Sequence, residues 1–242
     1  MATEAPRPAF YALSSGGWRD YVTLLHPPYT AWHLSYVVVG AALAPTLVAG
    51  RLVPTLIAFF LAVGVAAHAL DELHGRPLRT EIPDRTLVVL AAVSLAGAVA
   101  IGIYGAVTVS PWIALFVVAG ALAVVAYNVE MGPFHGDLQF AAAWGAFPVL
   151  TGAFAAEERI SAAAAVAALY AFLLSLAQRR LSTQVRHVRR RVVHVTGTME
   201  RRDGTAEPIT TETLITAEER ALRLLAASAC AVAIALVIMQ VA

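Results

Sequence analysis

The sequence predicts an all-α integral membrane protein with about seven transmembrane helices, judged by the length of its apolar runs. Of its 242 residues, 59% are hydrophobic and only 14% are charged, whereas soluble domains carry about 25% charged residues. The charged residues form short clusters between long apolar runs. These runs do not alternate as the strands of a membrane barrel do, so helices are expected.

The apolar runs predict the organisation of the chain. The predicted spans are residues 30–48, 54–72, 86–106, 111–129, 138–156, 161–178 and 221–241. They divide the chain into an N-terminal segment (1–29), a six-helix membrane core (30–178), an arginine-rich loop (179–220) and a seventh transmembrane helix (221–242). Cys230 is the one cysteine, so neither a disulfide framework nor a thiolate metal cluster is expected.

The basic residues predict the orientation of this multi-pass protein in the cell membrane. All 17 are arginines. The predicted spans place the N-terminus and the loops 73–85, 130–137 and 179–220 on the same side of the membrane, and only Arg51 and Arg159 then fall on the opposite side. Loops rich in basic residues remain in the cytosol. We therefore expect the N-terminus to be cytosolic and the C-terminus to lie on the opposite side.

The loop 179–220 has its own predicted structure. It begins as an arginine-rich continuation of the sixth helix, then alternates like a strand through Val193 and Val195. Arg202-Asp203-Gly204 is a turn signal, so a small cytosolic β-hairpin is expected before the last helix. The arginine run either anchors the chain to anionic lipid headgroups or contacts a phosphorylated substrate.

The first of two polar clusters ends the second predicted span. On a helix, His68 lies one turn from Asp71 and Glu72, so three potential metal ligands share one face. Ionisable groups at membrane depth are costly and indicate function. Beyond the helix, which Gly75 and Pro77 are expected to end, the cluster continues with His74, Arg76 and Arg79, the two arginines being exposed.

The second polar cluster joins the fourth and fifth predicted spans. It supplies Tyr127, Asn128, Glu130, His135 and Asp137. The predicted topology puts both clusters on the same side of the membrane, where they either bind one or two cations or only cap helix ends. Oxygen-only ligation would suit Mg²⁺, and mixed histidine and carboxylate ligation would suit Zn²⁺ or non-haem iron.

The end of the sixth span carries a third polar stripe. Gln178, Ser182 and Arg186 are four residues apart and share one helical face. This stripe is either a third wall of the same pocket or a solvated extension of the helix. His33 near the start of the first span is a weaker candidate, because an interfacial or core histidine fits that position equally well.

Three segments at the ends of predicted helices carry a recognisable pattern of residues. They are Leu25-His26-Pro27 leading into Ser35 and Gly40, Asp71 leading into Arg76-Pro77-Leu78, and Tyr127-Asn128 followed by residues 144–152. In this order and spacing they resemble the UbiA-type intramembrane prenyltransferase superfamily. They are similar, respectively, to its first helix, its first aspartate-rich loop, and the end of its fourth helix with its fifth helix. The similarity covers residues 22–180.

The resemblance implies a UbiA-like helical bundle in which two aspartate-rich loops hold Mg²⁺ against a prenyl diphosphate and a hydrophobic chamber takes the prenyl tail. The chain departs from the family pattern at both loops. The first retains only His68, Asp71 and Glu72 in altered spacing, and Gln178, Ser182 and Arg186 replace the second motif.

We expect a membrane enzyme with a lipophilic, isoprenoid-class substrate, with the bilayer as partner and no nucleic acid. Under the leading hypothesis, prenyl transfer, Asp71, Glu72 and Glu130 are catalytic and hold the metal together with Asp137. The substrate would contact Arg76, Arg79, Tyr127, Asn128, Gln178 and Arg186.

Two alternatives remain open. In the first, the same scaffold binds iron or zinc and oxidises or hydrolyses a membrane lipid. Its metal ligands would be His68, Asp71, Glu72, His74, Glu130, His135 and Asp137. In the second, the protein is a non-catalytic transporter or assembly subunit.

Overall fold

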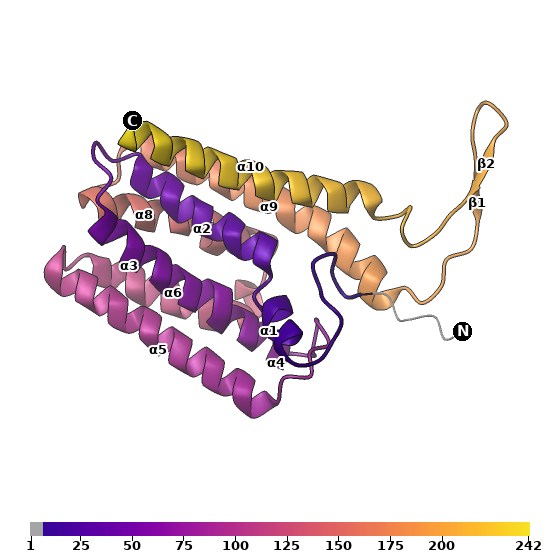
Figure 1. Cartoon of the computed structure of the whole chain (residues 1–242), viewed down its shortest axis with the longest axis horizontal. Coiled ribbons are helices and arrows are strands. Elements are labelled where there is room, and N and C mark those ends of the chain that lie inside the picture. Colours follow the sequence, from indigo (N-terminus) through magenta and orange to yellow (C-terminus); the bar gives the residue numbers. More distant parts are fainter. Residues whose placement is uncertain (1–6) are drawn as a thin grey trace.

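The computed structural model describes residues 7–242 as an elongated bundle of helices with one hairpin projecting beyond it (Figure 1). The helices are α1 (Trp18–Leu24), α2 (Pro27–Ala42), α3 (Ala49–Phe59), η1 (Phe60–Ala67), α4 (His68–Leu73), α5 (Asp84–Thr108), α6 (Ile113–Asn128), η2 (Gly132–Phe134), α7 (Asp137–Phe140), η3 (Ala141–Ala146), α8 (Phe147–Glu157), α9 (Ala162–Arg191) and α10 (Thr216–Val241). The strands are β1 (Thr198–Glu200) and β2 (Ala206–Pro208).

The apolar runs form helices as predicted, and several are long enough to cross a membrane. Within residues 7–242, five helices meet this criterion: Ala49–Leu73, Asp84–Thr108, Asp137–Glu157, Ala162–Arg191 and Thr216–Val241. The two other predicted spans coincide with α2 and α6, which have 16 residues each, fewer than the about 20 that a perpendicular span needs. Membrane-spanning helices are therefore supported, but the predicted count of seven is not confirmed.

The outer faces of these helices are apolar. On α5, Val93 and Val107 are 66% and 81% exposed, and on α10 Leu224 and Met239 are 68% and 76% exposed. Exposed apolar surface of this extent is unusual for a soluble monomer, and it is the surface that lipid tails cover in a membrane.

Close backbone packing holds α2 against α8. A Cβ atom on Gly40 would overlap the Val149 carbonyl oxygen, and one on Gly152 would overlap the Val37 carbonyl oxygen. Such reciprocal glycine contacts allow helices to approach closely in membranes. Trp32 on the same helix donates from Nε1 to the Tyr36 hydroxyl at 2.6 Å inside the core. Ser175 of α9 donates to the same Tyr36 hydroxyl at 3.4 Å, which links α2 to α9.

The predicted hairpin is present, but its first strand begins at Thr198, so Val193 and Val195 lie outside it. Strands β1 and β2 pair antiparallel, with Met199 opposite Glu207. At the turn, the Asp203 carboxylate accepts from the Thr205 backbone N–H and hydroxyl. The hairpin lies beyond the ends of α9 and α10 (Figure 1), and α9 continues without a break from the sixth predicted span through the arginine run.

Candidate functional site

A cavity of about 760 Å³ lies at the C-terminal ends of α4 and α6 and the loops that follow these helices. The start of α2 and the second half of α9 lie beside it. The N-terminal segment, from Pro8 to Tyr11, also lines it. This cavity brings together most of the residues predicted for the site: His68, Asp71, His74, Tyr127, Asn128, Glu130, His135, Asp137, Gln178 and Arg186. Both polar clusters and the stripe on the sixth span therefore contribute to one space, which we call the polar cavity.

The predicted site residues Glu72, Arg76 and Arg79 lie outside the polar cavity. Glu72 is fully buried, and its carboxylate accepts from the backbone N–H groups of Leu78 and Thr80 and from the Thr80 hydroxyl, each at 2.9 Å. These bonds hold the loop after α4 and occupy the carboxylate that had been expected to bind a metal.

The two arginines of this loop differ from each other. Arg76 is half-buried rather than exposed; it donates to the Thr80 and Ile82 carbonyl oxygens and pairs with Asp84. Arg79 is exposed as expected and has a positive φ of 57°. Arg76 thus stabilises the loop that leads into α5.

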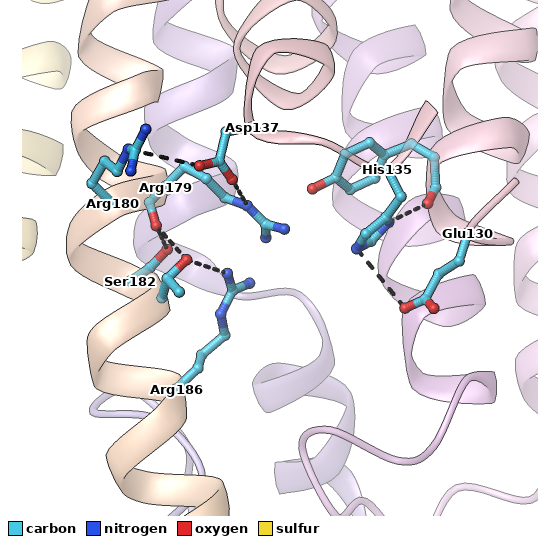
Figure 2. Close-up of polar contacts among 9 residues, drawn as sticks. Glu130, His135, Asp137, Arg179, Arg180, Ser182 and Arg186 are labelled. Carbon is cyan, nitrogen blue, oxygen red and sulfur yellow. Dashed lines mark hydrogen bonds and ion pairs between the residues drawn. The ribbon is translucent and has the colours of Figure 1, made fainter. Parts of the chain in front are cut away.

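Two carboxylates of the polar cavity are already paired. Asp137 accepts from Arg179 Nε at 3.1 Å and lies 3.7 Å from Arg180 Nε, and Glu130 lies 3.8 Å from His135 Nε2 (Figure 2). Among residues 7–242, no group of three or more histidine, cysteine, aspartate or glutamate side chains is placed to hold a metal ion. The Mg²⁺ site that the family resemblance implies and the iron or zinc site of the alternative stay predictions.

The α9 side of the polar cavity is basic. Arg179, Arg186 and Arg190 all line it. In Figure 2 the guanidinium groups of Arg179 and Arg186 extend from α9 toward the segment that carries His135. Arg186 donates to the Thr183 hydroxyl at 3.3 Å. Within residues 7–242, neither Arg186 nor Arg190 has a carboxylate within 4.0 Å, so these two guanidinium groups are not ion-paired, and Asp71 is the unpaired carboxylate that lines the same cavity.

Histidine and tyrosine side chains form the opposite part of the wall. The imidazoles of His26 and His68 stack with their centroids 3.9 Å apart, and the ring of Tyr11 lies 5.2 Å from His26. His68 Nδ1 lies 3.0 Å from the Gly64 carbonyl oxygen, which can only accept, so Nδ1 carries the proton and Nε2 keeps a lone pair. Burial, and then the neighbouring His68, holds the pKa of His26 well below its usual value. His26 is therefore neutral at physiological pH.

Polar atoms without a partner concentrate at this cavity. Among the described residues, the buried side-chain atoms that lack a hydrogen bond are His26 Nε2, His33 Nδ1 and Nε2, Tyr127 Oη, Gln178 Oε1 and Arg190 Nε. Every one belongs to a residue that lines the polar cavity. Because buried polar groups are normally hydrogen-bonded, this concentration is typical of a site that binds a polar ligand.

Sequence reasoning missed His26 and Tyr11 as site residues and gave His33 little weight. Arg179 and Arg190 belong to the arginine run, for which lipid anchoring and contact with a phosphorylated substrate were both predicted as open alternatives. His26 directly precedes the two prolines that start α2, and its φ of 46° is left-handed. An imidazole before a membrane helix was the available signal. Tyr11 lies in a segment without helical periodicity, so the sequence offered no signal for it.

A second cavity of about 210 Å³ lies between α3, η1, α5, α6, η3 and α8. Its walls are mostly apolar and include Phe59, Phe116 and Phe147, and its polar members include Arg51 and three threonines. We call it the apolar cavity. Trp144 on η3 lines both cavities, and it stacks on Phe140 of the polar cavity with ring centroids 6.0 Å apart. Trp144 therefore forms part of the wall of both the polar and the apolar cavity.

Comparison of the chain with protein-family models, curated proteins and solved structures gives no match.

Proposed function

We propose that this protein is a UbiA-like integral membrane enzyme that transfers a prenyl group from a prenyl diphosphate to a lipophilic acceptor. The observation that carries the proposal is that Trp144 lines both cavities, which places a basic space and an apolar space on either side of one side chain. An isoprenoid diphosphate has an anionic head and an apolar tail, and these match the basic polar cavity and the aromatic apolar cavity respectively.

The reaction can be assigned to the residues of the polar cavity. The allylic C–O bond breaks, the diphosphate leaves with the electron pair, and the acceptor attacks the allylic cation and then loses a proton. Guanidinium groups on α9 would stabilise the departing charge. The rings of Phe140, Trp144 and Tyr127 would face the allylic cation and stabilise it through their π-electrons. Asp71, which lines the cavity and has no ion pair among the described residues, is the proposed proton acceptor.

The predicted orientation belongs to the same proposal. We place the polar cavity, the N-terminus and the hairpin on the cytosolic side, since the arginines of α9 and its following loop are gathered there. A cytosolic opening gives water-soluble diphosphate released by the reaction a direct exit.

The test is conversion of a radiolabelled prenyl diphosphate into an organic-extractable product by membranes that contain the protein. We expect product with the wild type, a decrease of about 100-fold with Asp71→Asn because the proton acceptor is lost, and no change with the exposed hairpin variant Asp203→Asn. Absence of product from farnesyl, geranylgeranyl and longer prenyl diphosphates in the presence of a membrane lipid extract would contradict prenyl transfer.

A second candidate is the iron- or zinc-dependent oxidation or hydrolysis of a membrane lipid. The observation in its favour is the histidine wall, in which His26 and His33 have unpartnered ring nitrogens beside His68. Stoichiometric iron or zinc in the purified protein, lost with His68→Ala or His135→Ala, would favour it over prenyl transfer.

A further inference from the structure

The basic wall of the polar cavity is built from one face of α9. Arg179, Arg186 and Arg190 are separated by seven and four residues, which places them on one side of a helix. All three line the polar cavity, and their charges are close enough to repel one another. Three neighbouring guanidinium groups in a partly desolvated cavity favour binding of an anion of high charge density.

In the described part of the chain, the carboxylates that line the polar cavity form no ion pair with Arg186 or Arg190. Asp137 is shared between Arg179 and Arg180, Glu130 lies beside His135, and Asp71 lines the cavity without an ion pair among the described residues. Within residues 7–242, Arg186 and Arg190 lack a carboxylate within 4.0 Å. A divalent cation entering here would meet unneutralised guanidinium groups, whereas a phosphate would be attracted by them.

We propose that the polar cavity binds a diphosphate head directly through Arg186 and Arg190, without a bridging divalent cation. This inference rests on the proposed function, and it replaces the magnesium-bridged binding that the family resemblance implies. The guanidinium fork matches phosphate oxygens in bidentate geometry. Gln178, Ser182 and Tyr127, which line the same cavity, are placed to contribute further hydrogen bonds.

The same chemistry fits a diphosphate attached to a prenyl chain and free inorganic pyrophosphate. The two sources differ in the tail, for which the apolar cavity provides room. Farnesyl diphosphate and inorganic pyrophosphate are therefore the two probes that separate recognition of the head from recognition of the tail.

The experiment is a binding titration of the full-length protein in lipid nanodiscs with each probe, in excess EDTA and in excess Mg²⁺. We expect farnesyl diphosphate to bind in EDTA at least as tightly as in Mg²⁺. Arg186→Gln and Arg190→Gln should each weaken binding by about 10- to 100-fold, as expected for the loss of a charge-assisted hydrogen-bond pair.

Arg220→Gln is the matched control, since Arg220 is exposed on α10 and outside the cavity; its affinity should equal that of the wild type. Arg186→Lys retains the positive charge but not the bidentate guanidinium geometry. If this variant binds more tightly than Arg186→Gln, the loss in Arg186→Gln comes from the missing charge and not from an unfolded site.

The outcomes separate the two proposals. If farnesyl diphosphate binds only in Mg²⁺, or binds with unchanged affinity to both Arg186→Gln and Arg190→Gln, direct recognition by these arginines is wrong. Neither result contradicts prenyl transfer. Pyrophosphate bound as tightly as farnesyl diphosphate, in EDTA and with sensitivity to Arg186→Gln, would support the arginine site and contradict an isoprenoid substrate. Absence of binding by either probe in both conditions would overturn both proposals.

Discussion

At the scale of single residues, the buried carboxylate of Glu72 holds the loop that follows α4 through hydrogen bonds from Leu78 and Thr80. Helical spacing correctly joined His68 and Asp71 on the cavity side, because residues three apart share a helix face. The same spacing included Glu72, whose carboxylate instead binds the backbone of the following loop. Periodicity gives the direction of a side chain, but it carries no information on which nearby donors compete for it.

Glu72 provides the first residue-scale prediction. We expect Glu72→Gln to destabilise the protein by about 2–3 kcal/mol, because an amide presents N–H groups to backbone donors and leaves buried groups unpaired. Thermal unfolding in detergent measures this as a lower midpoint temperature, and the exposed hairpin variant Glu200→Gln is the control. A variant of normal stability that had lost substrate binding would instead place Glu72 in the functional site.

At the scale of elements, apolar run length predicted the helices well, but their ends were set by local chemistry. The first predicted span, 30–48, corresponds to α2 at Pro27–Ala42. It begins earlier because proline is favoured in the first turn of a helix, and it ends before Pro45, which follows its last turn. Turn residues likewise predicted the hairpin, since Asp203 and Gly204 lie in its turn. The π-helical segments η1 and η3 have no comparable sequence signal.

The α2–α8 contact yields a prediction at this scale. Gly152→Ala places a Cβ against the Val37 carbonyl oxygen, so the helices must separate, at a cost of about 1–3 kcal/mol. Gly50→Ala is the matched control because a Cβ there meets open space within α3. A lowered unfolding midpoint for Gly152→Ala alone is expected. Equal midpoints for the two variants would contradict the close contact.

At the scale of the whole molecule, the sequence predicted one polar face on an apolar bundle but not the apolar cavity or the residue that lines both cavities. The apolar cavity draws its walls from α3, α5, α6 and α8, which are distant in sequence, and most of its wall residues, taken alone, are ordinary apolar residues of a membrane helix. Only the packing of these helices makes Trp144 a wall residue of both the apolar and the polar cavity. The substrate class that we propose follows from this arrangement.

The most direct test of that arrangement is photo-crosslinking with a prenyl diphosphate analogue that carries a diazirine at the end of its tail. After irradiation of the full-length protein in nanodiscs, mass spectrometry of the peptides locates the labelled residues. We expect labels on Phe116 and Val117 of α6 and on Phe147 of α8, which line the apolar cavity, and we expect excess unlabelled farnesyl diphosphate to suppress them. Labels spread over the lipid-facing surface of α5 and α10, unaffected by that competitor, would contradict a substrate that spans both cavities.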